Sequence, residues 1–271
     1  MGLFEKKFCC ICGEKIGLLG NRRLEDGNLC KQCTAKLSPW FSDRRQSTVE
    51  QIRSQLVYRE ENQVKAAAFA CTRSFGSGMK VLLDDNAGLF TVTRARDLAE
   101  ANPDVLSLGD VTGCTITPRE HKTEVRFLND EKQYQSYEPK RYEYSYDIAV
   151  TIFVNNPWFD EMHFDVNSSR IDIGEPGFGL DGLQKQPQPM LNEVYRAQME
   201  TAQQIRFALT GIAPDAEEPF PVYAVAEEEI SEFQQPAEAP VAVVCPACGA
   251  SVTPDAAGFC PCCGTKLSTD R

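Results

Sequence analysis

Residues 9–33 read CCICGEKIGLLGNRRLEDGNLCKQC and contain two C-x-x-C pairs with seventeen residues between them. A second tetrad of paired cysteines lies in residues 245–263, CPACGASVTPDAAGFCPCC, with eleven residues between its pairs. A structural zinc ion takes four ligands in a tetrahedron, and paired C-x-x-C motifs supply four soft thiolates. We therefore expect two structural Zn²⁺ ions, bound by Cys9, Cys12, Cys30 and Cys33 in the first site and by Cys245, Cys248, Cys260 and Cys263 in the second.

Glycine follows the second cysteine in three of the four pairs, as Gly13, Gly249 and Gly264. At that place a positive φ lets the backbone curl so that its amide groups face the thiolates. Thr34 takes the place in the remaining pair. Because four thiolates leave no coordination position for water, the sequence predicts structural rather than catalytic zinc.

Each cysteine cluster has one surplus member, Cys10 in the first and Cys262 in the second. Cys262 is an alternative ligand to Cys263, although the position of Gly264 favours Cys263. A redox-active dithiol is a less favoured interpretation, because redox motifs usually occur singly at the start of a helix. Disulfides are disfavoured as well, since the cysteines are paired and the chain begins without a secretory signal.

The residues between the two cysteine tetrads fall into segments of different composition. Ser47 and Glu50 form a potential capping box, which predicts a helix over about 48–62. Residues 213–244 hold five prolines, eight acidic residues and no Lys or Arg, which is typical of a flexible linker. We expect a zinc-binding module over 1–42, a connecting helix within 43–64, an antiparallel β domain with a capping helix over 65–212, an acidic linker over 213–244 and a zinc ribbon over 245–271.

The β domain is predicted from short apolar runs separated by turns, about six or seven strands in all. Residues 66–76 read as the first strand, and Asp84–Gly88 supplies a turn between two apolar runs. Residues 119–141 are highly charged and predict a protruding hairpin, after which 142–154 form the strongest strand. An amphipathic helix is expected over 190–210, with a buried stripe of Met190, Leu191, Val194, Ala197 or Gln198, Thr201, Ile205, Ala208 and Leu209.

Three stretches resemble known families. Residues 9–41, with C-x-x-CG, IGLLGNR and a second C-x-x-C, resemble an uncharacterised bacterial zinc-binding domain of unknown function, and the resemblance continues through FSDRRQSTVEQIRSQLVYREEN. Residues 245–267 are similar to the generic zinc ribbon attached to many bacterial proteins. Strands followed by one helix, with VLSLGDVTGCTITPRE at 105–120, resemble a pleckstrin-homology-like domain of the bacterial or GRAM type.

These resemblances imply an α+β fold in which a pleckstrin-homology-like antiparallel β domain with a C-terminal helix is flanked by two small zinc-ribbon modules. None of them implies an assigned activity or catalytic residues. The sequence itself leads to the same expectation, because it contains no H-E-x-x-H motif, nucleophile triad or phosphate-binding glycine loop. We expect His121 to face solvent, His163 to be an ordinary strand residue, Asp84 and Asp85 to serve the turn, and Cys71 and Cys114 to be small core residues, and hence no enzyme.

The net charge of −11 is unevenly distributed, since residues 1–65 carry twelve basic and eight acidic groups while the rest is strongly acidic. Phosphate backbones and anionic lipids would repel most of the chain, and only the N-terminal module would attract them. We therefore expect a cytoplasmic adaptor that binds a protein partner. The alternative is a nucleic-acid-associated regulator that uses the zinc modules, and peripheral membrane contact stays open. The basic edge of the N-terminal module comprises Lys6, Lys7, Arg22, Arg23, Arg44 and Arg45.

Overall fold

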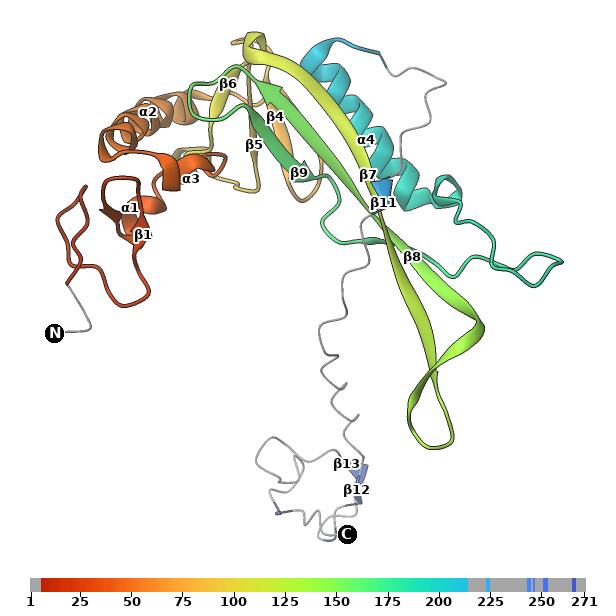
Figure 1. Cartoon of the computed structure of the whole chain (residues 1–271). Helices are drawn as coiled ribbons and strands as arrows, with labels where there is room; N and C mark the ends of the chain where they lie inside the picture. The colour runs from red at the N-terminus through yellow and green to blue at the C-terminus, as the bar shows by residue number, and fades with distance from the viewer. Residues whose placement is uncertain are drawn as a thin grey trace. The chain divides into compact units, whose positions relative to one another are not determined.

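The computed structural model describes residues 6–213 and, beyond them, only residues 223–224, 243–244, 246, 251–252 and 265–266 (Figure 1). The chain divides into two units, Met1–Glu227 and Glu228–Arg271. The expected acidic linker over 213–244 and the expected ribbon over 245–271 therefore lie almost wholly outside the described residues. In the second unit, β12 (Val243–Val244) pairs antiparallel with β13 (Ser251–Val252).

The described part of the first unit is a mixed α+β fold with antiparallel sheets and few helices, as expected. It begins with a small module around the first cysteine tetrad. A hairpin of β1 (Arg22–Arg23) and β2 (Asn28–Leu29) leads into the short helix α1 (Lys31–Thr34), and the 3-10 turn η1 (Asp43–Gln46) ends the module.

Helix α2 spans Val49–Ala68 and is longer than expected at its C-terminal end. The expected capping box is wrong by one residue. Thr48 is the N-cap and accepts from the amide of Gln51, while the Gln51 side chain accepts from the amide of Thr48. Ser47 instead donates its hydroxyl to the carbonyl of Asp43 at 2.9 Å, which ends the preceding turn.

A four-stranded antiparallel sheet follows in the order β3-β4-β5-β6. The expected strand over 66–76 is largely wrong, because the alanines at 66–68 continue α2 and only β3 (Arg73–Phe75) is extended. The turn after β4 is confirmed: the Asp84 carboxylate accepts from the amide of Ala87 at 3.0 Å, and Gly88 has a φ of +66°. The elements are β3 (Arg73–Phe75), β4 (Lys80–Asp84), β5 (Leu89–Thr93), α3 (Leu98–Ala101), β6 (Val105–Ser107) and η2 (Leu108–Asp110).

A second sheet is built around two long strands, β7 (Val111–Leu128) and β8 (Tyr134–Val154). They pair antiparallel almost throughout and run out to the turn at 129–133, so the expected charged hairpin is confirmed and is drawn in Figure 1. The other edge of β8 pairs first with β10 and then with β9. The remaining strands are β9 (Glu161–Asp165), β10 (Ile171–Gly174) and β11 (Tyr223–Ala224), of which β11 pairs parallel with β7.

Helix α4 (Glu193–Thr210) follows the 3-10 turn η3 (Pro189–Leu191) and lies beside β7 in Figure 1. Asn192 caps its start and Gly211, with a φ of +71°, ends it. The expected stripe is right at Ile205 and Leu209, and Ala208 packs partly buried against the core, but the N-terminal part of the stripe lies on the wrong side. Met190, Leu191 and Val194 are exposed, and the buried face is Tyr195, Met199, Ala202, Ile205 and Leu209.

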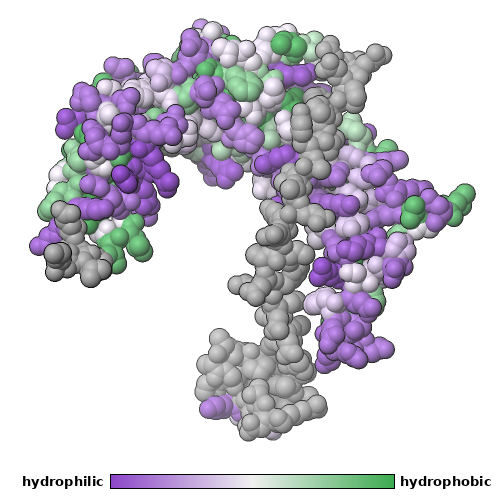
Figure 2. Space-filling model, viewed as in Figure 1, coloured by the Kyte–Doolittle hydropathy of each residue, from purple (hydrophilic) through white to green (hydrophobic). Residues whose placement is uncertain are grey.

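Both sheets and α4 share one apolar core. The alternation in β8 directs Tyr144 and Tyr146 inward, and the ring of Tyr146 meets that of Tyr195 edge-on at 5.4 Å between centroids. Within residues 6–213, none of the helices has the length and apolar character needed to cross a bilayer. Figure 2 shows that the visible surface is mostly hydrophilic, with small separate apolar patches.

Candidate metal centre

The first C-x-x-C pair sits on a tight turn of the backbone. The amide of Cys9 donates to the carbonyl of Glu14 at 2.9 Å, and the amide of Gly13 donates to the carbonyl of Cys9 at 2.9 Å. Gly13 has a φ of +74°, as the sequence predicts for the residue that follows the pair. The turn therefore presents the sulfurs of Cys9 and Cys12 to the same side.

The second pair begins helix α1. Cys30 is the N-cap, and its Sγ accepts a hydrogen bond from the amide of Cys33 at 3.4 Å. The amide of Cys30 donates in turn to the Sγ of Cys9 at 3.4 Å. Thr34, where a glycine would be usual, donates its hydroxyl to the carbonyl of Cys30 at 2.9 Å. Backbone amides thus face the sulfurs of both pairs, as they do around structural metals.

The four sulfurs of Cys9, Cys12, Cys30 and Cys33 lie within 4.8 Å of one another. The Sγ atoms of Cys12 and Cys30 are 3.7 Å apart, and all four thiols are free. Four sulfurs at about 2.3 Å from a tetrahedral zinc ion would be separated by about 3.8 Å. The geometry is therefore that of a site able to hold one metal ion, and its ligand set is consistent with zinc.

The pKa values of the clustered thiols are also consistent with the binding of a cation. Burial alone raises the pKa of the Cys9 thiol, but hydrogen bonds from the amides of Cys12, Cys30 and Ile11 outweigh it and lower the pKa to about 6. Burial, together with the neighbouring thiols, raises the pKa of Cys33. Four thiolates this close repel each other unless a positive ion lies between them, and a bound divalent cation would allow all four to ionise.

The cluster is part of the small core of the N-terminal module. Leu24 and Leu29 are fully buried beside the cysteines, and Ile52 of α2 closes the same core. The backbone amide of Val49, the first residue of α2, donates to the carboxylate of Asp26 at 2.8 Å. The first turns of α2 therefore belong structurally to the cysteine module.

Cys10 lies outside the cluster. Its amide donates to the carbonyl of Asn28 at 2.8 Å, and its exposed Sγ faces the amide of Asn28 at 3.4 Å. Gly27 approaches the same sulfur so closely that a β-carbon there would lie 2.9 Å from it and 2.7 Å from Val49. Cys10 thus packs between the hairpin and α2. The predicted second site, Cys245, Cys248, Cys260 and Cys263, lies outside the described residues, as does its alternative ligand Cys262.

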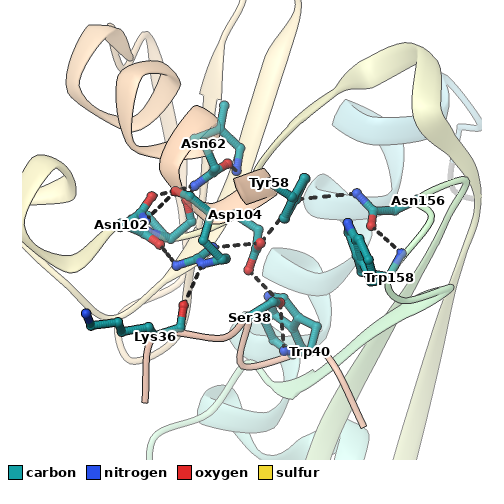
Figure 3. A network of polar contacts seen from close by, with 12 residues as sticks. Lys36, Ser38, Trp40, Tyr58, Asn62, Asn102, Asp104, Asn156 and Trp158 are labelled. Atoms are coloured by element: carbon teal, nitrogen blue, oxygen red, sulfur yellow. Dashed lines mark hydrogen bonds and ion pairs between the residues drawn. The ribbon is translucent and has the colours of Figure 1, made fainter. Parts of the chain in front are cut away.

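A buried polar network, shown in Figure 3, joins the module and α2 to the β domain. Arg59 of α2 donates to Asp104 at 2.8 Å, to the carbonyl of Lys36 at 3.3 Å and to the carbonyl of Asn102. Ser38 donates to the other oxygen of Asp104 at 2.8 Å. Burial raises the pKa of the Asp104 carboxyl, although the charge of Arg59 and the hydrogen bonds oppose the rise.

The network extends to both sheets. Tyr58 donates to Asp104 at 3.1 Å, and Asn156, in the loop after β8, donates to the Tyr58 hydroxyl at 3.4 Å. The side chain of Asn62 accepts from the amide of Val105 at 2.8 Å. Sequence reasoning missed this network. Its one signal is the helical spacing of the buried polar residues of α2, Gln55, Arg59 and Asn62.

Of the other residues considered from the sequence, two are placed differently from expectation. His121 does not face solvent: its side chain is 12% exposed and its Nε2 lies 2.8 Å from Asp147. Cys71 is exposed, whereas Cys114 in β7 packs against the core. His163 is an exposed strand residue, as expected. Asp85 flanks the turn and is ion-paired with Arg73 at 2.5 Å.

Comparison with known proteins identifies one region. Residues 7–55 match the family described as a domain of unknown function, DUF4428. The match spans the four-cysteine module and the first turns of α2, which are the parts that share the module core. Among curated proteins nothing matches the chain, and none of the solved structures does.

Proposed function

We propose that this chain is a non-enzymatic adaptor whose terminal modules are each held folded by one structural zinc ion. The observation that supports this proposal most directly is the cluster of four cysteine sulfurs in the small N-terminal core, which lie within 4.8 Å of one another. A module of this size buries too little apolar surface to fold alone, so metal binding would supply much of its folding free energy. Four thiolate ligands leave no open position for catalysis.

The second zinc ion is proposed on sequence grounds. Cys245, Cys248, Cys260 and Cys263 repeat the pairing of the first tetrad, and a glycine follows each pair. The acidic segment 213–244 would then connect the ribbon to the rest of the chain as a flexible linker. A cytoplasmic location fits this reading, because a reducing compartment keeps paired thiols available to a metal.

For residues 65–212 we propose a pleckstrin-homology-like domain, which would recognise a peptide, protein or headgroup. Its support is the order of elements: a four-stranded antiparallel sheet, a second, mainly antiparallel sheet and then the helix α4, all around one core. In such a domain the helix covers the open end of the curved sheets. The partner of the adaptor is proposed to be a protein.

A nucleic-acid-associated regulator is the second candidate. One observation favours it, the clustering of Arg22, Arg23, Arg44 and Arg45 around one cavity of the N-terminal module. The net charge of −11 opposes it, because acidic regions are repelled by a phosphate backbone. Binding to DNA or RNA that falls steeply with added salt would favour this candidate.

The adaptor proposal is tested by affinity capture with the full chain in reducing lysate treated with nuclease. The wild type and a Cys9→Ser variant are compared, and their zinc content is measured in parallel. We expect the wild type to hold two equivalents of zinc and to retain a protein partner after nuclease treatment. Capture that nuclease abolishes would favour the nucleic-acid regulator, and a wild type without bound zinc would contradict the proposal.

A further inference from the structure

The loop between the two cysteine pairs exposes two adjacent leucines. Leu18 is 81% exposed and Leu19 is 88% exposed, although Ile16 on the same loop is buried in the module core. Glycines flank the pair, and the amide of Gly20 donates to the carbonyl of Gly17 at 3.0 Å, which closes a tight turn. Two neighbouring leucines held out on a turn expose apolar surface to water, which is unfavourable unless a partner covers it.

Four arginines lie next to this turn. Arg22 and Arg23 come from β1, Arg44 and Arg45 come from η1, and together with Asn21 they line one open cavity. Arg44 is held there because its Nη1 donates to the carbonyl of Arg23 at 2.8 Å. Burial, together with the charges of Arg45 and Arg22, lowers the pKa of Arg44. None of these guanidinium groups has a carboxylate within 4.0 Å in the described part of the chain.

The leucine turn and the arginines form one continuous surface. Nη1 of Arg22 donates to the carbonyl of Leu19 and to that of Asn21, each at 3.3 Å. An apolar tip beside unpaired cationic groups matches the profile of a lipid bilayer, in which anionic phosphates lie above an apolar layer. We propose that this surface, Leu18 and Leu19 with Arg22, Arg23, Arg44 and Arg45, docks the protein on an anionic membrane.

In the docked state the leucines enter the interfacial region and the guanidinium groups bind lipid phosphates. Guanidinium groups suit this role because their planar donors match phosphate oxygens. Residues 6–48 carry nine basic and four acidic side chains, so the surface is locally positive despite the acidic remainder. At physiological salt the field of remote charges is screened beyond about 8 Å, so the local charge decides the contact.

A nucleic acid fits this surface less well. Non-specific binders of single strands stack bases on aromatic side chains, and no aromatic side chain lines the cavity formed by Asn21 and the four arginines. Exposed leucines on a turn would also gain nothing from a phosphate backbone. The docking surface rests on the proposed function in one respect, because the proposed metal ion would hold the module, and with it the turn, in place.

The test is sedimentation of the zinc-loaded full chain with vesicles. One set contains phosphatidylcholine with about one third phosphatidylglycerol, and the other contains phosphatidylcholine alone. We expect binding to the first set only, weakened by added salt. Inorganic phosphate and a short RNA are added as competitors, which distinguishes a bilayer from a free phosphate or a nucleic acid as the ligand.

Two pairs of substitutions test the two halves of the surface. Arg23→Ala with Arg45→Ala removes the two exposed arginines, and we expect binding to fall by about tenfold or more. The matched control, Arg94→Ala with Arg96→Ala, removes two exposed arginines elsewhere and leaves binding unchanged. Zinc content is measured for every variant, so that an unfolded module is recognised.

Leu18→Ser with Leu19→Ser tests the apolar half, and we expect a loss of about tenfold or more with little change in zinc content. Its control is Leu180→Ser with Leu183→Ser, two leucines that are also exposed but lie far along the chain. Equal binding by the surface variants and the wild type would overturn the proposal. Binding to neutral vesicles, or to RNA in preference to vesicles, would overturn it too.

The experiments distinguish failure of the membrane-docking surface from failure of the zinc-dependent adaptor. If the zinc-loaded wild type does not bind anionic vesicles, the docking surface is wrong and the zinc-dependent adaptor stands. If the chain binds anionic vesicles equally well before and after chelation, through the same leucines and arginines, the docking surface stands. In that case the claim that zinc holds the N-terminal module folded is wrong.

Discussion

The N-terminal module and the two-sheet region differ in the apolar surface that each buries. The module core has eight buried residues, and three of them are cysteines of the metal cluster. The core shared by the sheets and α4 has twenty-two, including several large aliphatic and aromatic side chains. A core of eight residues offsets little of the conformational entropy lost on folding, so we expect the module, but not the two-sheet region, to depend on a bound metal ion.

Metal removal should have the largest effect on folding. The loss of structure should be confined to the N-terminal module. Cys9→Ser removes a buried ligand, so we expect the loss of one equivalent of zinc and the unfolding of the module, including the first turns of α2. The two-sheet region should stay folded. Hydrogen exchange monitored by mass spectrometry measures both regions at once.

The control for this prediction is Cys10→Ser, since the sulfur of Cys10 lies outside the cluster. It should retain the full zinc content and the protection of the module. A module that stays protected after Cys9→Ser would show that its apolar core suffices, and the comparison between the two regions would then be wrong.

Breaking the buried ion pair between Arg59 and Asp104 should have the next largest effect on stability, because this pair joins the two regions. Arg59→Ala leaves Asp104 buried without its guanidinium partner, which we expect to cost about 3–5 kcal/mol in the free energy of unfolding. Chemical denaturation measures this cost. Replacing both partners, Arg59→Met with Asp104→Leu, should recover part of it, since no buried charge is then left unpaired.

If the single and the double replacement destabilise the protein equally, the charge pair itself is not what matters at the junction. Loss of zinc from the Arg59→Ala variant would show that the N-terminal module depends on the junction as well as on the metal. The hydrogen bond from Arg59 to the carbonyl of Lys36 is the contact that would carry this dependence.

A cavity in the larger core should destabilise the two-sheet region and spare the module. Ile152 of β8 is fully buried, and Ile152→Ala should cost about 2–4 kcal/mol. Zinc should remain bound. Val64→Ala, at a position 72% exposed on α2, is the matched control and should change stability by less than about 0.5 kcal/mol. Release of zinc by Ile152→Ala at ambient temperature would mean that the two regions unfold as one.

The smallest effect concerns an exposed ion pair next to the turn of the first sheet. Hydrogen bonds from Arg73 and, to a lesser degree, from Thr72 to the carboxylate of Asp85 lower its pKa from 3.8 to about 2. Because the folded pKa lies below the unfolded one, the contact stabilises the fold above about pH 4. Its contribution is lost as the pH falls through about 2.

Carboxyl NMR titration checks this pKa directly, and Arg73→Gln should return the pKa of Asp85 toward 3.8. The change in overall stability should be slight, since exposed pairs contribute little. An unchanged pKa in the variant would show that Thr72, rather than the guanidinium group, stabilises the carboxylate.

The sequence predicts the cysteine cluster well because the chemistry of a metal site limits the spacing of its ligands. It also predicts the Asp84 turn and the long β7–β8 hairpin, since turn residues and alternation act locally. It fails where tertiary packing decides. The buried face of α4 is rotated away from Met190 and Val194, because the sheets select the side that carries Tyr195 and Met199.

The junction network escaped prediction for a related reason. Arg59 and Asp104 are far apart in sequence and each is of a type that is usually exposed, so neither signals burial by itself. The alanines at the end of α2 illustrate the same limit. The sequence predicts a strand from residue 66, but Ala66 to Ala68 continue α2, in which Ala66 is buried and Asn62 accepts from the amide of Val105.

The most direct test of the central claim is X-ray absorption at the zinc edge on the purified, reduced chain carrying Cys245→Ser and Cys248→Ser, so that only the N-terminal centre is occupied. We expect one zinc ion surrounded by four sulfur atoms at about 2.3 Å. A shell with nitrogen or oxygen ligands, or with fewer than four sulfurs, would contradict it.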